Sequence, residues 1–317
     1  MFMAGVRADC QALQGRIARG EGVNLRILDD NVWSYSKDVI PPAWERLGAD
    51  CRIPARARGF MRLFSDWMPD IYTFQEFSPK IMAYFSVQLE RWGYAYAEPQ
   101  VKEQRAKDGT IIPQDPIKNW TPIFYHKGTL ELLRSDYVLY TPKAWSDAGS
   151  KSFSCAVFLH KATGKKFAVI TTHLWWKDES AVIGSDMARA SQACLIMAHV
   201  AILEKEFGTL PIFLTGDMNC RESSLAVQTF MTGGFEQCYR IATVAADRHS
   251  GHHWCANDGF GENESNLKRT RESHAIDHCL LKNRDGQAEV KRFDCVMDEY
   301  ILPLTDHYPN IVDAIIL

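Results

Sequence analysis

Six short segments of the chain place a carboxylate, amide or imidazole side chain beside an apolar run. The segments are LDDNVW (residues 28–33), DIYTFQE (70–76), TTHL (171–174), LTGDMN (214–219), AIDH (275–278) and LTDHYP (304–309). Carboxylate and amide oxygens are the ligands that hard cations such as Mg²⁺ prefer. Imidazoles beside carboxylates can hold or transfer protons near neutral pH. Together these residue types favour a metal-assisted hydrolysis in which an activated water is the nucleophile.

A phosphate ester is a substrate that needs this combination, because the attacking oxygen and the phosphoryl group both carry negative charge. A metal ion can neutralise that charge while a base removes the proton from water. We expect Glu76 to bind the metal, with Asn31 beside it and Asp306 as a direct or indirect contact. The expected cofactor is Mg²⁺ or Mn²⁺.

The other polar residues of the six segments fit acid–base and phosphate-binding roles. Asp217 follows a glycine, which predicts a sharp, exposed turn where its carboxylate can take a proton from water. Asn219 would orient that water or the phosphate, while His173 and His307 would donate to phosphoryl oxygens. Asp277 would hold one imidazole in a single tautomer and raise its pKa.

The elements around these segments can bring them together. An alternating pattern predicts a strand over residues 23–27, and apolar runs predict strands over 71–74, 166–172 and 211–215, each followed by one of the polar positions. Two more strands, over 275–281 and 311–317, begin beside Asp277 and beside Asp306 and His307. Strands running both ways across a sheet would collect all six positions on one rim. Neighbouring strands lie about 4.8 Å apart, so these groups could share one ion.

Helical patterns lie between the strands. Two apolar stripes, over residues 60–67 and 81–92, predict helices with a core-facing side, the first ended by Pro69. A third stripe, ended near Gly208, consists of Met187, Ala190, Cys194, Met197 and Ala201. The arginines at positions 52, 56, 58 and 62 are expected on the solvated side of the first helix rather than in a nucleic-acid patch.

Composition bounds the class of protein. The 317 residues are 46% hydrophobic, enough for a large core, and carry a net charge of -3, which argues against tight non-specific binding of nucleic acid. Nine scattered cysteines without a CxxC pair disfavour a disulfide scaffold and favour a reducing compartment. We therefore expect a cytoplasmic protein, or a secreted one if a leader has been removed. Residues 1–22 read as a helical extension and residues 23–317 as a single catalytic domain, with no membrane span and no obligate protein partner indicated.

In order and spacing, the six segments resemble those of the endonuclease/exonuclease/phosphatase superfamily, which includes DNase I, over nearly the whole chain from residue 23 to residue 317. The resemblance implies an α/β fold of the DNase I type, a four-layer α/β/β/α sandwich of two packed mixed β-sheets flanked by helices. It also implies the roles already argued: Glu76 at the metal, Asp217 and Asn219 at the water, and His307 with Asp277 at the phosphate.

The chain departs from some branches of that superfamily. Asp30 stands where an aromatic residue usually precedes the asparagine, and Trp33 stands where many AP endonucleases have an additional acid. The basic stretch and the Trp-Thr-Asp-Arg element of the inositol 5-phosphatases do not occur. These features resemble most the generic bacterial members, whose substrates vary.

Substrate contacts are expected from three polar loops, over residues 101–120, 175–184 and 242–272. Within or beside them, Trp175 and Trp176 could stack on a ring of the substrate or cap the core, Asn119 could line the cleft, and His253 lies in a His-rich loop near the site. The expected partner is a phosphate ester, with nucleic acid or a nucleotide among the candidates.

Three functions remain open on the sequence. The first is a phosphodiesterase of nuclease type, which we favour. The second is a phosphomonoesterase acting on a phosphorylated sugar, inositol or lipid headgroup. The third is a catalytically silent module that binds a phosphorylated ligand, against which the intact set of eight polar positions argues.

Overall fold

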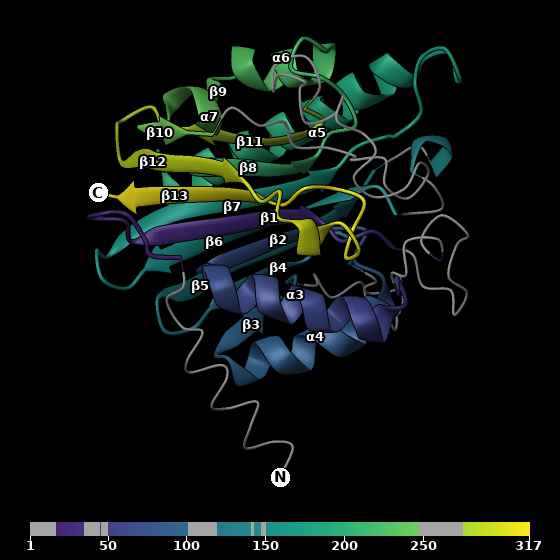
Figure 1. Cartoon of the computed structure of the whole chain (residues 1–317). Helices are drawn as coiled ribbons and strands as arrows, with labels where there is room; N and C mark the ends of the chain where they lie inside the picture. The colour runs from purple at the N-terminus through teal and green to yellow at the C-terminus, as the bar shows by residue number, and fades with distance from the viewer. Residues whose placement is uncertain are drawn as a thin grey trace, which may run out of the picture.

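Two β-sheets pack face to face between two layers of helices (Figure 1), which confirms the expected four-layer α/β/β/α sandwich. The computed structural model describes residues 17–34, 45, 50–100, 119–140, 143–146, 150–246 and 275–317. The expected helix over residues 1–22 lies mostly outside these ranges, and residues 17–22 form turns and irregular backbone. Within the described residues, no helix combines the length and the hydropathy required of a membrane span.

The two sheets contain seven and six strands. The seven-stranded sheet has the order β10-β12-β13-β1-β2-β4-β3 and comprises β1 (Leu25–Asn31), β2 (Ile71–Gln75), β3 (Tyr94–Tyr96), β4 (Ile123–His126), β10 (Val244–Ala245), β12 (Ala288–Cys295) and β13 (Asn310–Ile316). The six-stranded sheet has the order β5-β6-β7-β8-β11-β9 and comprises β5 (Leu130–Leu139), β6 (Ser152–His160), β7 (Lys165–His173), β8 (Ile212–Asp217), β9 (Phe235–Gln237) and β11 (Asp277–Lys282).

Both sheets are mixed, and this directs the polar positions to one rim. In the first sheet β1 runs parallel to β2 and antiparallel to β13, so the ends of β1 and β2 lie beside the start of β13. In the second sheet β7 runs parallel to β8, and β11 is antiparallel to β8 with Asp277 opposite Asp217. The expected gathering of strand ends and strand starts at one edge is therefore confirmed.

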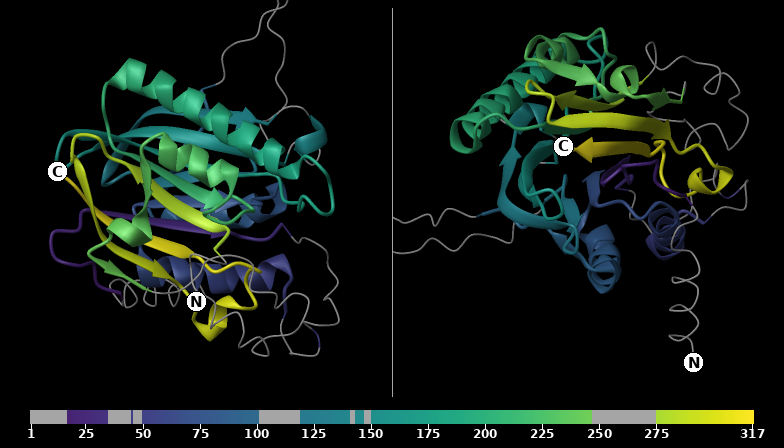
Figure 2. Two further views of the ribbon diagram at one scale, coloured as in Figure 1. Left: turned by 90° about the horizontal axis from the view of Figure 1, so that it is seen from above. Right: turned by 90° about the vertical axis from the view of Figure 1, so that its left-hand side faces the viewer.

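Helices cover both outer faces. Figures 1 and 2 place α3 (Ile53–Trp67) and α4 (Pro79–Arg91) on one side of the sheets, and α5 (Ser185–Phe207) and α6 (Leu225–Thr232) on the other. The Ser78 side chain accepts a hydrogen bond from the Ile81 N–H and so caps the start of α4. Short helices η1 (Lys143–Trp145), α7 (Cys238–Ile241) and η3 (Glu299–Ile301) lie in connections.

The core has three apolar layers. Phe60, Phe64 and Phe74 belong to the layer between α3, α4 and the seven-stranded sheet. Residues of β7, β8, α5 and α6 form the layer on the opposite outer face. The third layer, which includes Ile27 and Phe213, lies between the two sheets. Because β1 is covered on both faces, all seven of its residues are buried and the alternation expected over residues 23–27 does not mark a solvent-facing side.

The buried face of α5 differs from the expected stripe. Met187 is 62% exposed and Cys194 is also exposed, whereas the buried residues include Arg189 and Gln192. These two polar side chains are buried because they bind backbone. Arg189 donates to the carbonyls of Trp175 and Lys177, and Gln192 accepts from the Trp175 N–H and donates to a carbonyl of η1. Helix α5 therefore supports the loop that follows β7.

Between the sheets, the core becomes polar close to the rim. The Asp29 carboxylate accepts hydrogen bonds from the Thr73 hydroxyl and the Gln75 amide, each at 2.8 Å. Gln75 also donates to Thr171, and the Thr215 hydroxyl donates to Thr73, so strands of the two sheets are cross-linked. Burial raises the pKa of Asp29 to about 7. This network forms the floor beneath the rim.

Candidate functional site

A cavity of about 380 Å³ opens at the rim where the strand ends meet. Six of the residues expected at the metal or in catalysis line it, as does Trp176, expected at the substrate; the six are Glu76, His173, Asp217, Asn219, Asp306 and His307. Ser34, Trp120, Ser150 and Lys151 complete its wall. A second cavity, of about 430 Å³, lies at the β10–β12 edge, where Arg19, Lys291 and Arg292 are each paired with an acidic neighbour. Only the first of these two cavities has an array of groups that could do chemistry.

The backbone at the rim adopts conformations that ordinary residues rarely take. Gly216 has φ +132°, and a Cβ there would lie 2.1 Å from the Thr172 carbonyl oxygen, so glycine is required where β8 passes close to β7. Trp33, Glu76 and Asn219 also have positive φ, at 53°, 56° and 51°. Non-glycine residues in this region are strained and persist only where the surrounding structure holds them, which is common at functional sites.

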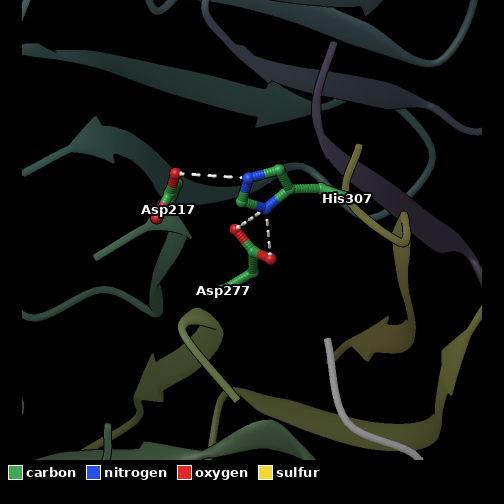
Figure 3. Close-up of side chains that lie close together, drawn as sticks. All are labelled: Asp217, Asp277 and His307. Atoms are coloured by element: carbon green, nitrogen blue, oxygen red, sulfur yellow. Dashed lines mark hydrogen bonds and ion pairs between the residues drawn. The ribbon is translucent and has the colours of Figure 1, made fainter. Parts of the chain in front are cut away.

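Asp277 and His307 form a hydrogen-bonded pair, with Asp217 on the other side of the imidazole ring (Figure 3). The His307 Nδ1 lies 2.9 and 3.2 Å from the two Asp277 carboxylate oxygens, and its Nε2 lies 3.8 Å from Asp217 Oδ2. Burial opposes a charge on the imidazole, but the carboxylates of Asp277, Asp217 and Asp306 outweigh it and raise the pKa of His307 well above its ordinary value. His307 is therefore a charged donor at neutral pH, pointing into the cavity.

Asp217 is the centre of the second group of contacts. Asn31 Nδ2 donates to its Oδ2 at 3.0 Å, the Asn219 N–H donates to its Oδ1 at 2.9 Å, and His173 Nε2 lies 3.3 Å away. Burial alone would raise the pKa of Asp217, but the nearby positive charges of His173, His307 and Lys151 hold it well below its usual range. The expectation of an exposed residue is wrong. Asp217 is 2% exposed because its carboxylate needs these donors around it.

The groups expected at a metal lie on the neighbouring part of the wall. Glu76 Oε2 accepts the Ser34 N–H at 2.8 Å, and Asn31 Oδ1 accepts the Trp33 N–H at 3.0 Å. Burial raises the pKa of Glu76, but the charges of His173 and Lys151 outweigh this effect, so the pKa lies below its usual value and the carboxylate is ionised.

This donor set fits a hard divalent cation. The negative charge of Asp306 acts to raise the pKa of Glu76, a repulsion between carboxylates that a cation between them would relieve. Asp217, Asp277 and His307 also lie close together, with one possible ligand atom each within 4.8 Å of one another, but a protonated His307 has no lone pair for a metal. The oxygen atoms around Glu76 and Asp306 are therefore the ligand set that suits a hard cation, and the Asp277–His307 pair suits proton donation instead.

Lys151 is a residue of the site that sequence reasoning missed. Its ammonium group lies 2.5 Å from His173 Nε2, and the residue is only 4% exposed. It directly precedes β6, in which Ser152 is paired with His173. Lys151 therefore brings a buried positive charge to the cavity wall. The signal for it lay in the β6–β7 register, which the sequence alone does not reveal.

The residues expected at the substrate divide into three groups. Trp176 is 51% exposed and lines the cavity. Trp175 is 4% exposed, its indole N–H donates to Ser185, and its ring packs edge-on against Trp145, so it belongs to the core. The Asn119 amide is buried and bonded to Tyr96 and Ser154, and its neighbour Trp120 lines the cavity instead. His253 lies outside the described residues.

Comparisons with known proteins address the fold. An endonuclease/exonuclease/phosphatase from Bacteroides vulgatus is 19% identical, with a TM-score of 0.63, covering 92% of this chain and 99% of that one. A mannosyl-6-phosphatase from Bacteroides thetaiotaomicron is 17% identical, with a TM-score of 0.62 and the same coverage. D. rerio TDP2 complexed with single-strand DNA product is 14% identical, with a TM-score of 0.57, covering 92% and 98%. No protein-family model matches the chain, and no curated protein matches its sequence. The chain thus has the endonuclease/exonuclease/phosphatase fold.

Proposed function

We propose that this chain is a divalent-metal-dependent phosphoesterase of the endonuclease/exonuclease/phosphatase superfamily, with residues 23–317 as its catalytic domain. The observation that carries the proposal is the convergence of Glu76, Asp217 and the Asp277–His307 pair on one cavity of about 380 Å³. These side chains come from both sheets and from distant parts of the sequence. Packing does not explain why these polar side chains meet at one cavity, because burying each of them costs desolvation free energy.

The protein residues would divide the work of hydrolysis. The ionised Asp217 carboxylate would accept the proton of the attacking water, oriented by Asn219. His307, held by Asp277, would donate to a phosphoryl oxygen on one side, while Lys151, in contact with His173, would place positive charge on the other. A divalent cation held by Glu76 and Asp306, with Asn31 behind them, would neutralise charge on the phosphate.

The substrate class that we propose is a phosphodiester, as in nucleases and other phosphodiesterases. Trp120 and the half-exposed Trp176 line the cavity and offer faces on which a base or another ring could stack. The comparisons support phosphoester chemistry without choosing a substrate, since proteins with this fold include a mannosyl-6-phosphatase and a protein complexed with single-strand DNA product.

The test is hydrolysis of bis-p-nitrophenyl phosphate against p-nitrophenyl phosphate, with Mg²⁺ or Mn²⁺ and with EDTA. We expect metal-dependent turnover that favours the diester and that Asp217→Asn lowers by roughly 10²–10⁴-fold. The exposed Asp285→Asn serves as the matched control and should retain wild-type turnover. A preference for the monoester would support the phosphomonoesterase alternative. Phosphate binding without any turnover would support the silent module.

A further inference from the structure

A buried arginine on α3 connects the two segments that carry the proposed metal ligands. Arg56 is 2% exposed, although the sequence pattern placed it on the solvated side of its helix. Its guanidinium donates through Nη2 to the carbonyls of Val32 and Trp33, the latter at 2.8 Å, and through Nε to the carbonyl of Leu304. The first two carbonyls follow β1, and the third precedes the segment with Asp306 and His307.

Each carbonyl held by Arg56 lies next to a group that contacts the site. In the segment after β1, the Trp33 N–H donates to Asn31 Oδ1 and the Ser34 N–H donates to Glu76 Oε2. In the other segment, the hydroxyl of Thr305 donates to the Asn31 carbonyl and accepts the N–H of His307. The positions of Asn31, Glu76 and His307 are thus coupled to one side chain behind the cavity.

The backbone held by Arg56 is strained. Trp33 has φ 53°, a conformation that is unfavourable for a bulky residue and persists only where neighbouring groups hold it. The Arg56 guanidinium carbon lies 5.1 Å from the Trp33 ring centroid, so the same side chain also contacts the strained residue through a cation–π interaction. Lysine cannot replace this arrangement, because its ammonium is a point charge without the planar fork of donors.

The charge of Arg56 also matters at this position. Burial lowers the pKa of Arg56 to about 10, while the carboxylates of Asp306, Asp30 and Glu76 favour its charged form. At neutral pH the guanidinium therefore remains positive behind a group of acidic side chains. It offsets their mutual repulsion from a side that is closed to substrate.

We propose that Arg56 is a positioning residue that sets the geometry of the cation site by fixing the segments after β1 and before Asp306. The inference rests on the proposed function, because it assigns Arg56 a role at that same site. Arg56 does not line the cavity and touches neither substrate nor cation; it acts through Glu76, Asn31 and His307.

The first test compares Arg56→Lys with Arg58→Lys, a matched change at an exposed arginine of the same helix. Binding of Mn²⁺ alone is measured by calorimetry, and kcat, KM and Tm are measured in parallel. We expect Arg56→Lys to bind Mn²⁺ roughly 10–100-fold more weakly and to lose a similar factor in kcat, as is usual when a residue that orients metal ligands is changed. The KM of Arg56→Lys for the diester should stay near the wild-type value. Arg58→Lys should keep the wild-type Mn²⁺ affinity, kcat, KM and Tm. A purely structural role would lower Tm without changing Mn²⁺ affinity in the folded protein.

A second measurement needs no variant. In ¹⁵N-labelled wild-type protein, the Arg56 Nε–H should exchange slowly with solvent and should shift when Mg²⁺ is added, whereas the Arg58 Nε–H should do neither. Wild-type Mn²⁺ affinity in folded Arg56→Lys, beside lost affinity in Glu76→Gln, would overturn this inference alone; so would an unresponsive Arg56 signal. A wild-type protein that neither binds Mn²⁺ nor hydrolyses phosphoesters would overturn the proposed function and this inference together.

Discussion

The Asp277–His307 pair gives the sharpest prediction, because replacing Asp277 by asparagine removes one charge and almost no volume. His307 Nδ1 lies 2.9 Å from Asp277 Oδ2, and an asparagine in this position could still accept that hydrogen bond through its amide oxygen. At an effective dielectric constant of about 20, two unit charges at this separation interact by roughly 6 kcal/mol. This corresponds to about 4 pKa units at 1.36 kcal/mol per unit.

The shift in the variant should be smaller than that figure. The amide oxygen of the asparagine still accepts the Nδ1–H of His307 and keeps part of the attraction to the imidazolium. Asp217 Oδ2, 3.8 Å from His307 Nε2, and Asp306 are unchanged and keep the pKa above its ordinary value. We expect the pKa of His307 to fall by about two units. Because His307 must be protonated to donate, activity is lost as pH rises through this pKa, and the alkaline limb of the pH–rate profile should move to lower pH.

The assay is kcat for bis-p-nitrophenyl phosphate between pH 5 and pH 10, with the His307 ring signals followed by NMR over the same range. At the alkaline end of this range, above the pKa of His307 in both proteins, we expect Asp277→Asn to lose roughly 10²-fold in kcat, while Asp285→Asn keeps the wild-type profile. An alkaline limb in the same place as that of wild type, with kcat within twofold, would refute the role given to this pair.

Other predictions follow from the same geometry. Glu76→Gln should weaken Mn²⁺ binding at least tenfold with little change in Tm, since it removes a charge that the cation would neutralise; unchanged affinity would count against the ligand assignment. Gly216→Ala should destabilise the fold by roughly 3 kcal/mol in chemical denaturation, because its Cβ would meet the Thr172 carbonyl at 2.1 Å. Asp29→Asn should stabilise the protein at pH 8 by on the order of 1–4 kcal/mol. The folded-state pKa of Asp29 is raised from 3.8 to about 7, so in wild type its stabilising contribution is complete below about pH 4 and is lost as pH rises to about 7; the variant should lose this pH dependence. Trp176→Ala should raise the KM for a nucleotide diester roughly tenfold, because a base can stack on the indole ring. The KM for a small alkyl diester, which has no ring to stack, should not change.

The rim of the site could be predicted from the sequence because strand ends are marked locally. Each of Asn31, Glu76, His173 and Asp217 follows a short apolar run, and Asp277 begins one, so their gathering required only that the strands run in both directions across the sheets. The sandwich itself was implied by the family resemblance, and the structure confirms it. The helices over residues 53–67 and 79–91 also agree with their apolar stripes.

What the sequence could not reveal depends on tertiary contacts. Lys151 reaches the cavity through the pairing of β6 with β7, a register set by residues outside its own segment. Arg56 was expected on the solvated side of its helix, and Arg189 stands outside the apolar stripe expected for its own helix. Each is buried because backbone carbonyls of neighbouring loops accept its hydrogen bonds. Trp175 and Trp176 are adjacent in sequence and opposite in role, since only the direction of each side chain after β7 decides which one faces the cavity.

The central claim is that a hard cation binds where the two sheets present their strand ends. Anomalous scattering from a crystal soaked in Mn²⁺ tests it most directly. The claim predicts a peak within the rim cavity, at coordination distance from a Glu76 carboxylate oxygen, that is lost in Glu76→Gln. A protein that hydrolyses phosphoesters with Mn²⁺ but shows no anomalous peak in this cavity, or a peak elsewhere, would contradict it.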